Sequence, residues 1–276
     1  MDVDPSKNIR RNKMDVIIMP TKAQAEKMAA TILANAIKEK PAFTLGLATG
    51  RTMEHLYDIL VEMHQKEGLD FSLCKSFNLD EYVGFDGSNV NSYRYFMNKF
   101  LFDRVNIDKR NTHVPDGVAE DLEAAAAQYE AEMDACGGVD IQLLGIGRTG
   151  HIGFNEPLSS FSSRTRAVTL TKTTFEQNSP LFEKPEDMPM RAVTMGVGTI
   201  LDAKCLLMVA TSAEKADIVS KMIEGPVTSM ISATALQLHE NAIVVLDEDA
   251  ASKLEGKEEY IWSFKRDPKW AAYQNI

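Results

Sequence analysis

The chain has 276 residues, of which 44% are hydrophobic and 25% are charged, an ordinary composition for a globular protein with a core of normal size. Its formal net charge of −10 argues against nucleic acid or an anionic membrane surface as a partner, because neither favours an acidic protein. A small phosphorylated substrate is still compatible with this charge, since a pocket can be locally positive on an acidic protein.

Two further features bear on where the protein works. Cys74, Cys136 and Cys205 lie far apart, match no zinc-binding spacing and cannot all be paired within the chain. Reduced, buried thiols are therefore expected. The sequence shows no signal-peptide core and no apolar run of 18 residues, which predicts an intracellular, cytoplasmic protein.

The chain reads as one domain with short additions at its ends. Residues 1–13 are polar and lack periodicity, which predicts a flexible N-terminal extension. The domain is expected over 14–264, without internal repeats or a linker. A tail over 265–276 follows, and its Trp270 and Tyr273 leave two readings open: it covers a neighbouring subunit or it remains mobile.

Apolar runs alternate with helical patterns along the domain. The helices expected between the strands follow a capping box at Thr21, run from residue 52 to about Lys66, span Asp121–Cys136 and begin near Ala213. The expected strands are Val16–Met19, Phe43–Ala48, Lys75–Leu79, Val139–Leu144, Cys205–Ala210 and Ala242–Leu246.

This alternation of strands and helices predicts an α/β fold. The expected architecture is a single, modified Rossmann-like domain with an open, twisted and mostly parallel sheet, helices on both faces, and a helical flap around 158–190. Ligands of such folds bind at the carboxyl ends of the strands.

Candidate anion-binding groups follow the second expected strand. Thr49, Gly50, Arg51 and Thr52 form a glycine turn that leads into a helix, so backbone N–H groups and the helix dipole face the turn. The pattern is neither a Walker A loop nor a complete dinucleotide fingerprint, and a plain tight turn is the alternative. Lys215, also at a helix start, makes sense as part of an anion site or as an exposed surface lysine.

Candidate proton-transfer groups follow two other strands. Asp80 and Glu81 are adjacent carboxyl groups at a strand end, where burial would raise the pKa of one and create a general base. A helix-capping Asp beside a solvated Glu is the alternative. His151 lies in the glycine-rich loop Gly145–Pro157, and Glu156 follows five residues later, a pairing suited to a proton shuttle.

Taken in order, these segments resemble the glucosamine-6-phosphate deaminase family, whose members are also called isomerases. The resemblance covers roughly residues 14–264. The matching segments are LGLATGRT, SFNLDEYVGF, NSYRYFM, LLGIGRTGHIGFNEP, SSRTR, MGVGTILDA and ALQLHENAIVVLDE.

The resemblance implies a role for each candidate. Asp80 resembles the base that moves a proton between C2 and C1. His151 looks like the group that assists opening of the pyranose ring, and Glu156 looks like its partner. The turn at 49–52 and Lys215 match phosphate-binding positions. The implied reaction converts glucosamine 6-phosphate to fructose 6-phosphate and ammonia through an enolamine, with no metal or organic cofactor, in a homo-oligomer.

Three departures from the family pattern stand out. Thr149 occupies a position where the family usually has Asp or Asn. Residues 178–182, with Pro180, lack an arginine that relatives use for phosphate, and Arg51 is hypothesised to restore that charge. Hexameric bacterial relatives bind an N-acetylated activator through the N-terminal amine and a lysine at the position of Val168. The extension and this valine therefore predict no such activation.

Other readings remain beside the leading one. Galactosamine-6-phosphate deaminase is a close alternative, because the orientation of one hydroxyl depends on pocket geometry. A non-catalytic sugar-phosphate sensor is another, although the sequence contains no DNA-binding helix-turn-helix and does contain Asp80, His151 and Glu156. The 6-phosphogluconolactonases of the same superfamily fit less well, because residues 154–157 follow the deaminase pattern.

Overall fold

The computed structural model describes residues 14–276, so the predicted flexible extension lies outside the described residues. Within them, seven strands form one sheet in the order β1-β10-β9-β6-β2-β3-β5, and every neighbouring pair is parallel. This confirms the predicted mostly parallel sheet. Its strands are β1 (Asp15–Met19), β2 (Thr44–Leu47), β3 (Lys75–Asn78), β5 (Thr112–His113), β6 (Ile141–Leu144), β9 (Leu206–Ala210) and β10 (Ala242–Asp247).

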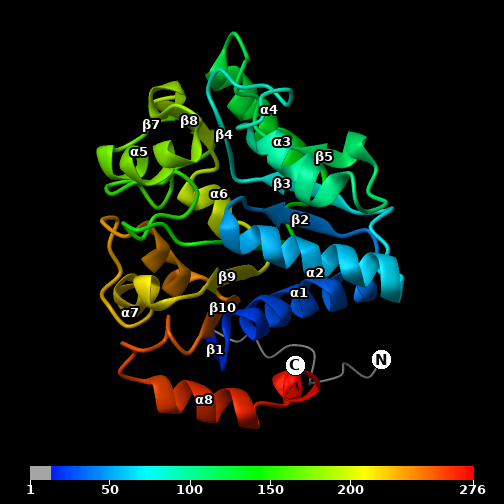
Figure 1. Ribbon diagram of the computed structural model, residues 1–276, viewed down its shortest axis with the longest axis vertical. Coiled ribbons are helices and arrows are strands. Elements are labelled where there is room, and N and C mark those ends of the chain that lie inside the picture. The colour runs from blue at the N-terminus through cyan, green and yellow to red at the C-terminus, as the bar shows by residue number, and fades with distance from the viewer. Residues whose placement is uncertain (1–13) are drawn as a thin grey trace, which may run out of the picture.

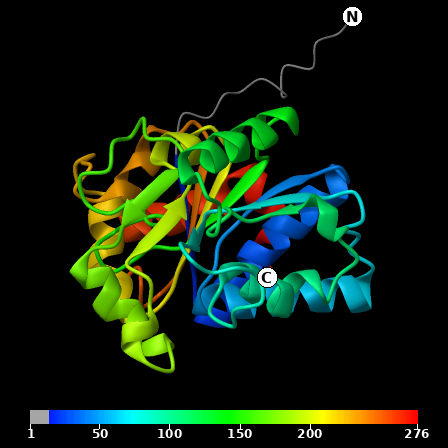
Figure 2. The ribbon, with the colours of Figure 1, turned by 90° about the horizontal axis from the view of Figure 1, so that it is seen from above.

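Helices cover both faces of this sheet. In Figure 1, α1 (Lys22–Glu39) and α2 (Arg51–Glu67) lie across one face, and Figure 2 shows α4 (Leu122–Ala135) on the opposite side. Strands β9 and β10 are buried along their whole length, which is why their sequences are continuous apolar runs. The remaining helices are α3 (Tyr93–Met97), α5 (Lys172–Asn178), α6 (Val197–Leu201), α7 (Ala216–Ile223) and α8 (Lys257–Arg266).

Local signals in the sequence account for several helix boundaries. The side chain of Thr21 accepts a hydrogen bond from the N–H of Gln24 and so caps α1. Asp121 caps α4 in the same way. Helix α2 ends at Gly68, which adopts a left-handed conformation with φ 73°. These boundaries lie within a residue or two of the expected ones.

A second, smaller sheet was not predicted. It is antiparallel, in the order β4-β8-β7, with β4 (Asp80–Tyr82), β7 (Arg166–Thr169) and β8 (Arg191–Thr194). The predicted strand at 75–79 ends one residue early, because the chain leaves the large sheet at Leu79 and enters the small one. The segment 158–190 is also not simply helical, since it contains β7 as well as α5. Pairing of β7 with β8 is a long-range contact that no local pattern reveals.

The C-terminal residues pack on their own chain. Trp270 is 3% exposed and belongs to the main hydrophobic core, and the hydroxyl of Tyr273 accepts a hydrogen bond from Asn35 at 3.1 Å. All three cysteines are free thiols. Cys74 and Cys205 are buried as predicted, whereas Cys136 is only partly buried. Over residues 14–276 no helix is both long and apolar enough to cross a membrane.

Candidate functional site

The turn between β2 and α2 is open toward solvent at the carboxyl edge of the large sheet. Gly50 adopts φ 117°, a conformation that other residues rarely take, and α2 begins directly after it. No side chain caps this helix, so its first backbone N–H groups can face a ligand. Arg51 is exposed, and Thr49 and Thr52 are partly buried beside it.

Lys215 lies in a short 3₁₀ turn that follows β9. Its ammonium donates a hydrogen bond to the carbonyl oxygen of Ile146 at 2.8 Å, which fixes the side chain against the glycine-rich loop. Burial, and secondarily the charge of Arg148, lower the pKa of Lys215. The alternative of a freely exposed surface lysine is therefore wrong.

The strand order of the large sheet places the turn at 49–52 near Lys215. Strands β2 and β9 both flank β6, whose carboxyl end leads into the glycine-rich loop. A Cβ placed on Gly145, at the start of this loop, would lie 3.6 Å from Cε of Met53 in the first turn of α2. The glycine-rich loop therefore lies between the turn at 49–52 and Lys215.

Asp80 begins β4 and lies opposite Thr194 of β8. It is 7% exposed, and burial, followed by the neighbouring charge of Glu81, raises the pKa of Asp80 to about 8. A Cβ on Gly153 would lie 3.4 Å from one carboxylate oxygen of Asp80, so the glycine-rich loop passes directly against this group.

Glu81 has a different environment from the one considered as an alternative. It is 2% exposed, and its carboxylate accepts hydrogen bonds from the backbone N–H groups of Tyr82 at 2.8 Å, Tyr93 at 3.0 Å and Arg94 at 3.0 Å. Glu81 thus accepts the first two N–H groups of α3, whose N-cap residue is Ser92. The reading of Asp80 as a helix cap beside a solvated Glu is wrong.

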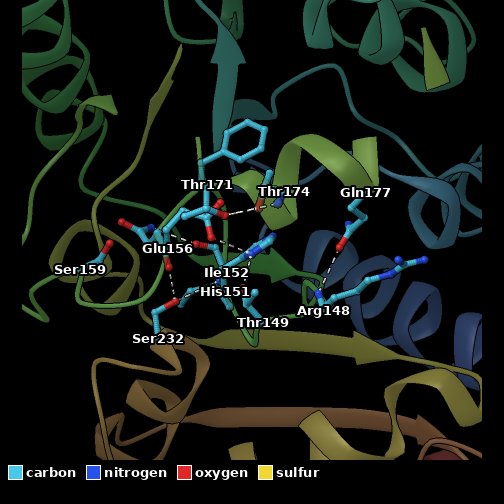
Figure 3. A network of polar contacts seen from close by, with 12 residues as sticks. Arg148, Thr149, His151, Ile152, Glu156, Ser159, Thr171, Thr174, Gln177 and Ser232 are labelled. Atoms are coloured by element: carbon cyan, nitrogen blue, oxygen red, sulfur yellow. Dashed lines mark hydrogen bonds and ion pairs between the residues drawn. The ribbon is translucent and has the colours of Figure 1, made fainter. Parts of the chain in front are cut away.

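His151 and Glu156 form a buried pair within the glycine-rich loop. Nδ1 of His151 lies 3.4 Å from Oε2 of Glu156 and 2.8 Å from the hydroxyl of Thr149, as Figure 3 shows. A Cβ on Gly147 would lie 2.1 Å from Nε2 of His151, so only glycine leaves room for this ring.

The carboxylate of Glu156 lies between His151 and two threonines of the flap. Both oxygens are buried without a close hydrogen-bond partner, and the nearest polar groups are His151, Thr171 and Thr174. Although burial by itself would raise the pKa of Glu156, these three groups lower it overall. Sequence reasoning missed both threonines, because the flap contains no pattern that links it to the loop.

Together the described residues form one candidate active site. His151 and Glu156 belong to the glycine-rich loop, and Asp80 lies against it at Gly153. Lys215 and the turn at 49–52 lie near the start of the same loop. Among residues 14–276 there is no group of three or more His, Cys, Asp or Glu side chains arranged to hold a metal ion. The arrangement combines a buried carboxyl group of raised pKa, an imidazole–carboxylate pair, and an edge that carries an uncapped helix start and a lysine.

Comparison with known proteins shows the family to which the chain belongs. The family model described as glucosamine-6-phosphate isomerases/6-phosphogluconolactonase matches residues 20–245. The chain is 51% identical to the glucosamine-6-phosphate deaminase of Shewanella loihica over 247 residues, which is 90% of this chain and 92% of that protein. It is 45% identical to the one from Clostridium perfringens, covering 87% of this chain and all of that protein.

Solved structures agree with these relatives. A monomeric glucosamine-6-phosphate deaminase superposes with a TM-score of 0.85 at 43% identity, over 87% of this chain and 100% of that one. A 6-phosphogluconolactonase from Leishmania guyanensis, at 20% identity and a TM-score of 0.67 over 87% of this chain and 98% of that one, shares the fold. On the match to the family model and to these relatives, this chain belongs to the glucosamine-6-phosphate isomerase/6-phosphogluconolactonase family.

Proposed function

We propose that the protein deaminates glucosamine 6-phosphate to fructose 6-phosphate and ammonia. The observation that supports this most strongly is the contact between the Asp80 carboxylate and the loop that contains His151 and Glu156. The names of the relatives described above point to the same substrate.

In the proposed reaction, His151 assists opening of the pyranose ring, and Glu156 orients its imidazole through Nδ1. Asp80 then moves a proton from C2 to C1 of the open-chain sugar. Its raised pKa makes it a stronger base than an exposed carboxylate, so it suits abstraction of a proton next to a carbonyl. Loss of the C2 proton gives the enolamine, and protonation of C1 gives an imine at C2; water then adds to C2 and ammonia leaves.

The phosphate of the substrate is assigned to the opposite side of the loop. The N–H groups at the start of α2, the hydroxyls of Thr49 and Thr52, and the cations Arg51 and Lys215 supply donors of the type that anions prefer. Binding of the phosphate there would hold C1 and C2 of the sugar against Asp80 and His151.

The experiment that tests the function measures ammonia release from purified protein, with glucosamine 6-phosphate and galactosamine 6-phosphate supplied separately. Release from the first, with fructose 6-phosphate appearing in step, is the expected result. Release from the second alone would make the protein a galactosamine-6-phosphate deaminase. If neither reacts while either raises the melting temperature, the protein is a sugar-phosphate sensor.

The Asp80→Asn variant tests the assignment of the base. The amide cannot accept the C2 proton, so turnover should fall at least a thousandfold, at the upper end of what general-base catalysis contributes. Binding of the phosphorylated substrate, followed by the rise in melting temperature, should change little because the phosphate contacts are remote. Retained turnover would remove Asp80 from this role.

Two expectations remain proposals of their own. A homo-oligomer is proposed on the family resemblance alone, whereas the similar solved deaminase is described as monomeric. Sedimentation velocity at several concentrations distinguishes the two. The expected cytoplasmic location likewise stays a prediction.

A further inference from the structure

Helix α5 presents polar side chains toward the candidate site, although a surface helix normally buries an apolar face. Thr171 is its N-cap residue, Thr174 is fully buried, and Gln177 and Asn178 are partly buried. These positions are spaced by three or four residues and therefore lie on one side of the helix. Figure 3 shows Thr171, Thr174 and Gln177 directed toward the loop that contains His151.

Each polar group on this side meets a different part of the site. The side-chain oxygen of Gln177 accepts a hydrogen bond from the N–H of Arg148 at 3.3 Å. The amide of Asn178 donates one to the hydroxyl of Tyr82 at 3.4 Å. At the other end of the helix, Thr171 and Thr174 lie beside the buried carboxylate of Glu156.

The direction of the hydroxyl hydrogens follows from the backbone. Oγ1 of Thr171 accepts the N–H of Thr174 at 3.3 Å, and its own hydroxyl donates to Oγ1 of Thr174 at 3.4 Å. The oxygen of Thr174 is then an acceptor, so its hydrogen is available for another partner. Because Thr174 is 0% exposed, that partner is not water from the bulk, and Glu156 is the carboxylate beside it.

We propose that Thr174 is a positioning residue, whose hydroxyl orients Glu156 and through it the imidazole of His151. Thr171 supports it by holding the Thr174 hydroxyl in the required direction. The two threonines thereby connect the flap helix to the proton-transfer pair of the candidate site. The expected change in kcat rests on the proposed function, whereas the expected change in the environment of Glu156 does not.

The effect on pH dependence has a definite sign. In the proposed arrangement a hydrogen bond from the Thr174 hydroxyl favours the charged form of Glu156, so losing it raises the pKa of that carboxyl. If the ionised carboxylate is the active form, the acid limb of the kcat–pH profile moves to higher pH. Of the other charged or titratable groups around this loop, His151 lies 3.4 Å from Glu156, Asp80 lies against Gly153, and Arg166 donates a hydrogen bond to Asn155 at 3.0 Å.

Three variants separate the hydroxyl from the shape of the side chain. Thr174→Val removes the donor and preserves the volume, Thr174→Ser keeps the donor, and Thr173→Val makes the same change at an exposed position of the same helix. With Thr174→Val, kcat should fall about tenfold, KM should stay within about twofold, and the acid limb should move upward. Thr174→Ser and Thr173→Val should resemble the parent protein.

A readout independent of turnover keeps the two proposals distinguishable. The titration of His151 and Glu156, followed by NMR in the full-length protein, should show a raised apparent pKa for the carboxylate in Thr174→Val. If the parent protein releases no ammonia, the proposed function fails while this titration still decides the inference. A Thr174→Val protein with an unchanged titration, or equal losses in the Val and Ser variants, would overturn it.

Discussion

Two adjacent carboxyl groups, Asp80 and Glu81, differ in what surrounds them. Three backbone N–H groups bond to Glu81, whereas Asp80 faces Gly153 and has its pKa raised to about 8. Side chains of neighbouring strand residues point to opposite faces, which separates the two environments. The sequence predicted that one carboxyl of the pair would be a base, but it could not show that the other accepts the first N–H groups of a helix that begins twelve residues later.

Arg51 offers a second test at the scale of single residues. Its guanidinium is exposed at the first position of α2, where the helix N-terminus already favours an anion. Replacing it with Gly should raise KM for the phosphorylated substrate about tenfold, the size expected for a lost charge-assisted hydrogen bond, while kcat changes little. The measurement is steady-state kinetics at low and high salt.

Arg51→Lys is the matched control, since it retains the charge without the planar guanidinium. Its KM should lie between those of the parent and the Gly variant. An unchanged KM in Arg51→Gly would mean that this side chain does not contact the phosphate, and the hypothesis that it replaces the missing arginine near Pro180 would be abandoned.

At the scale of elements, a buried carboxylate and the N-cap Ser92 together satisfy the first N–H groups of α3. The helix is short, and Glu81 accepts the N–H groups of its first two residues, Tyr93 and Arg94. In Glu81→Gln one acceptor oxygen becomes a donor that faces another donor. We expect a loss of about 1–3 kcal/mol in the free energy of unfolding, measured by urea denaturation.

Glu120→Gln is a suitable control for this change, because Glu120 is exposed. Its free energy of unfolding should stay within about 0.5 kcal/mol of the parent value. Equal stability of Glu81→Gln and the parent protein would show that solvent or another group replaces the lost acceptor.

Most of the large sheet could be predicted from the sequence, but the small sheet and the structure of the flap could not. Six strands of the large sheet were predicted because burial on both faces leaves mostly apolar runs, whereas β5, two polar residues long, was missed. The small sheet was missed because β4 has three residues and β7 is only partly buried, so neither leaves a strong period of two. For the same reason the flap was expected to be helical, and the contacts of Thr171 and Thr174 with Glu156 were not foreseen.

At the scale of the whole molecule, one ionic cluster lies at the amino end of the large sheet, opposite the candidate site. Asp140 precedes β6 and accepts hydrogen bonds from Lys40 at 2.5 Å, Lys204 at 2.8 Å and the N–H of Thr44 at 2.8 Å. Burial alone would raise the pKa of Asp140, but these donors lower it overall.

This lowered pKa makes part of the stability depend on pH. The contribution is present above the unfolded value of 3.8 and is lost as the pH falls through the still lower folded value. Both lysines are half exposed, so solvent screening limits the contribution to about 1 kcal/mol. Asp140→Asn should therefore be less stable than the parent at pH 7, with a gap that narrows toward pH 3.

The measurement is the urea midpoint across this pH range, with Asp134→Asn as the control because Asp134 is exposed on α4. A constant difference between Asp140→Asn and the parent at every pH would contradict the proposed linkage. It would indicate that the substitution acts through packing alone.

The division of the chain into two sheets has a consequence for which ligands can be held. Asp80 belongs to the small sheet, whereas the turn at 49–52 and Lys215 follow strands of the large one. In the proposed complex the substrate spans the boundary between the two sheets. The way the sheets are joined therefore fixes the separation between the phosphate-binding groups and Asp80. A sugar phosphate one carbon shorter would reach either the phosphate-binding groups or Asp80, but not both. Inorganic phosphate would bind at the large sheet alone and leave Asp80 without a ligand.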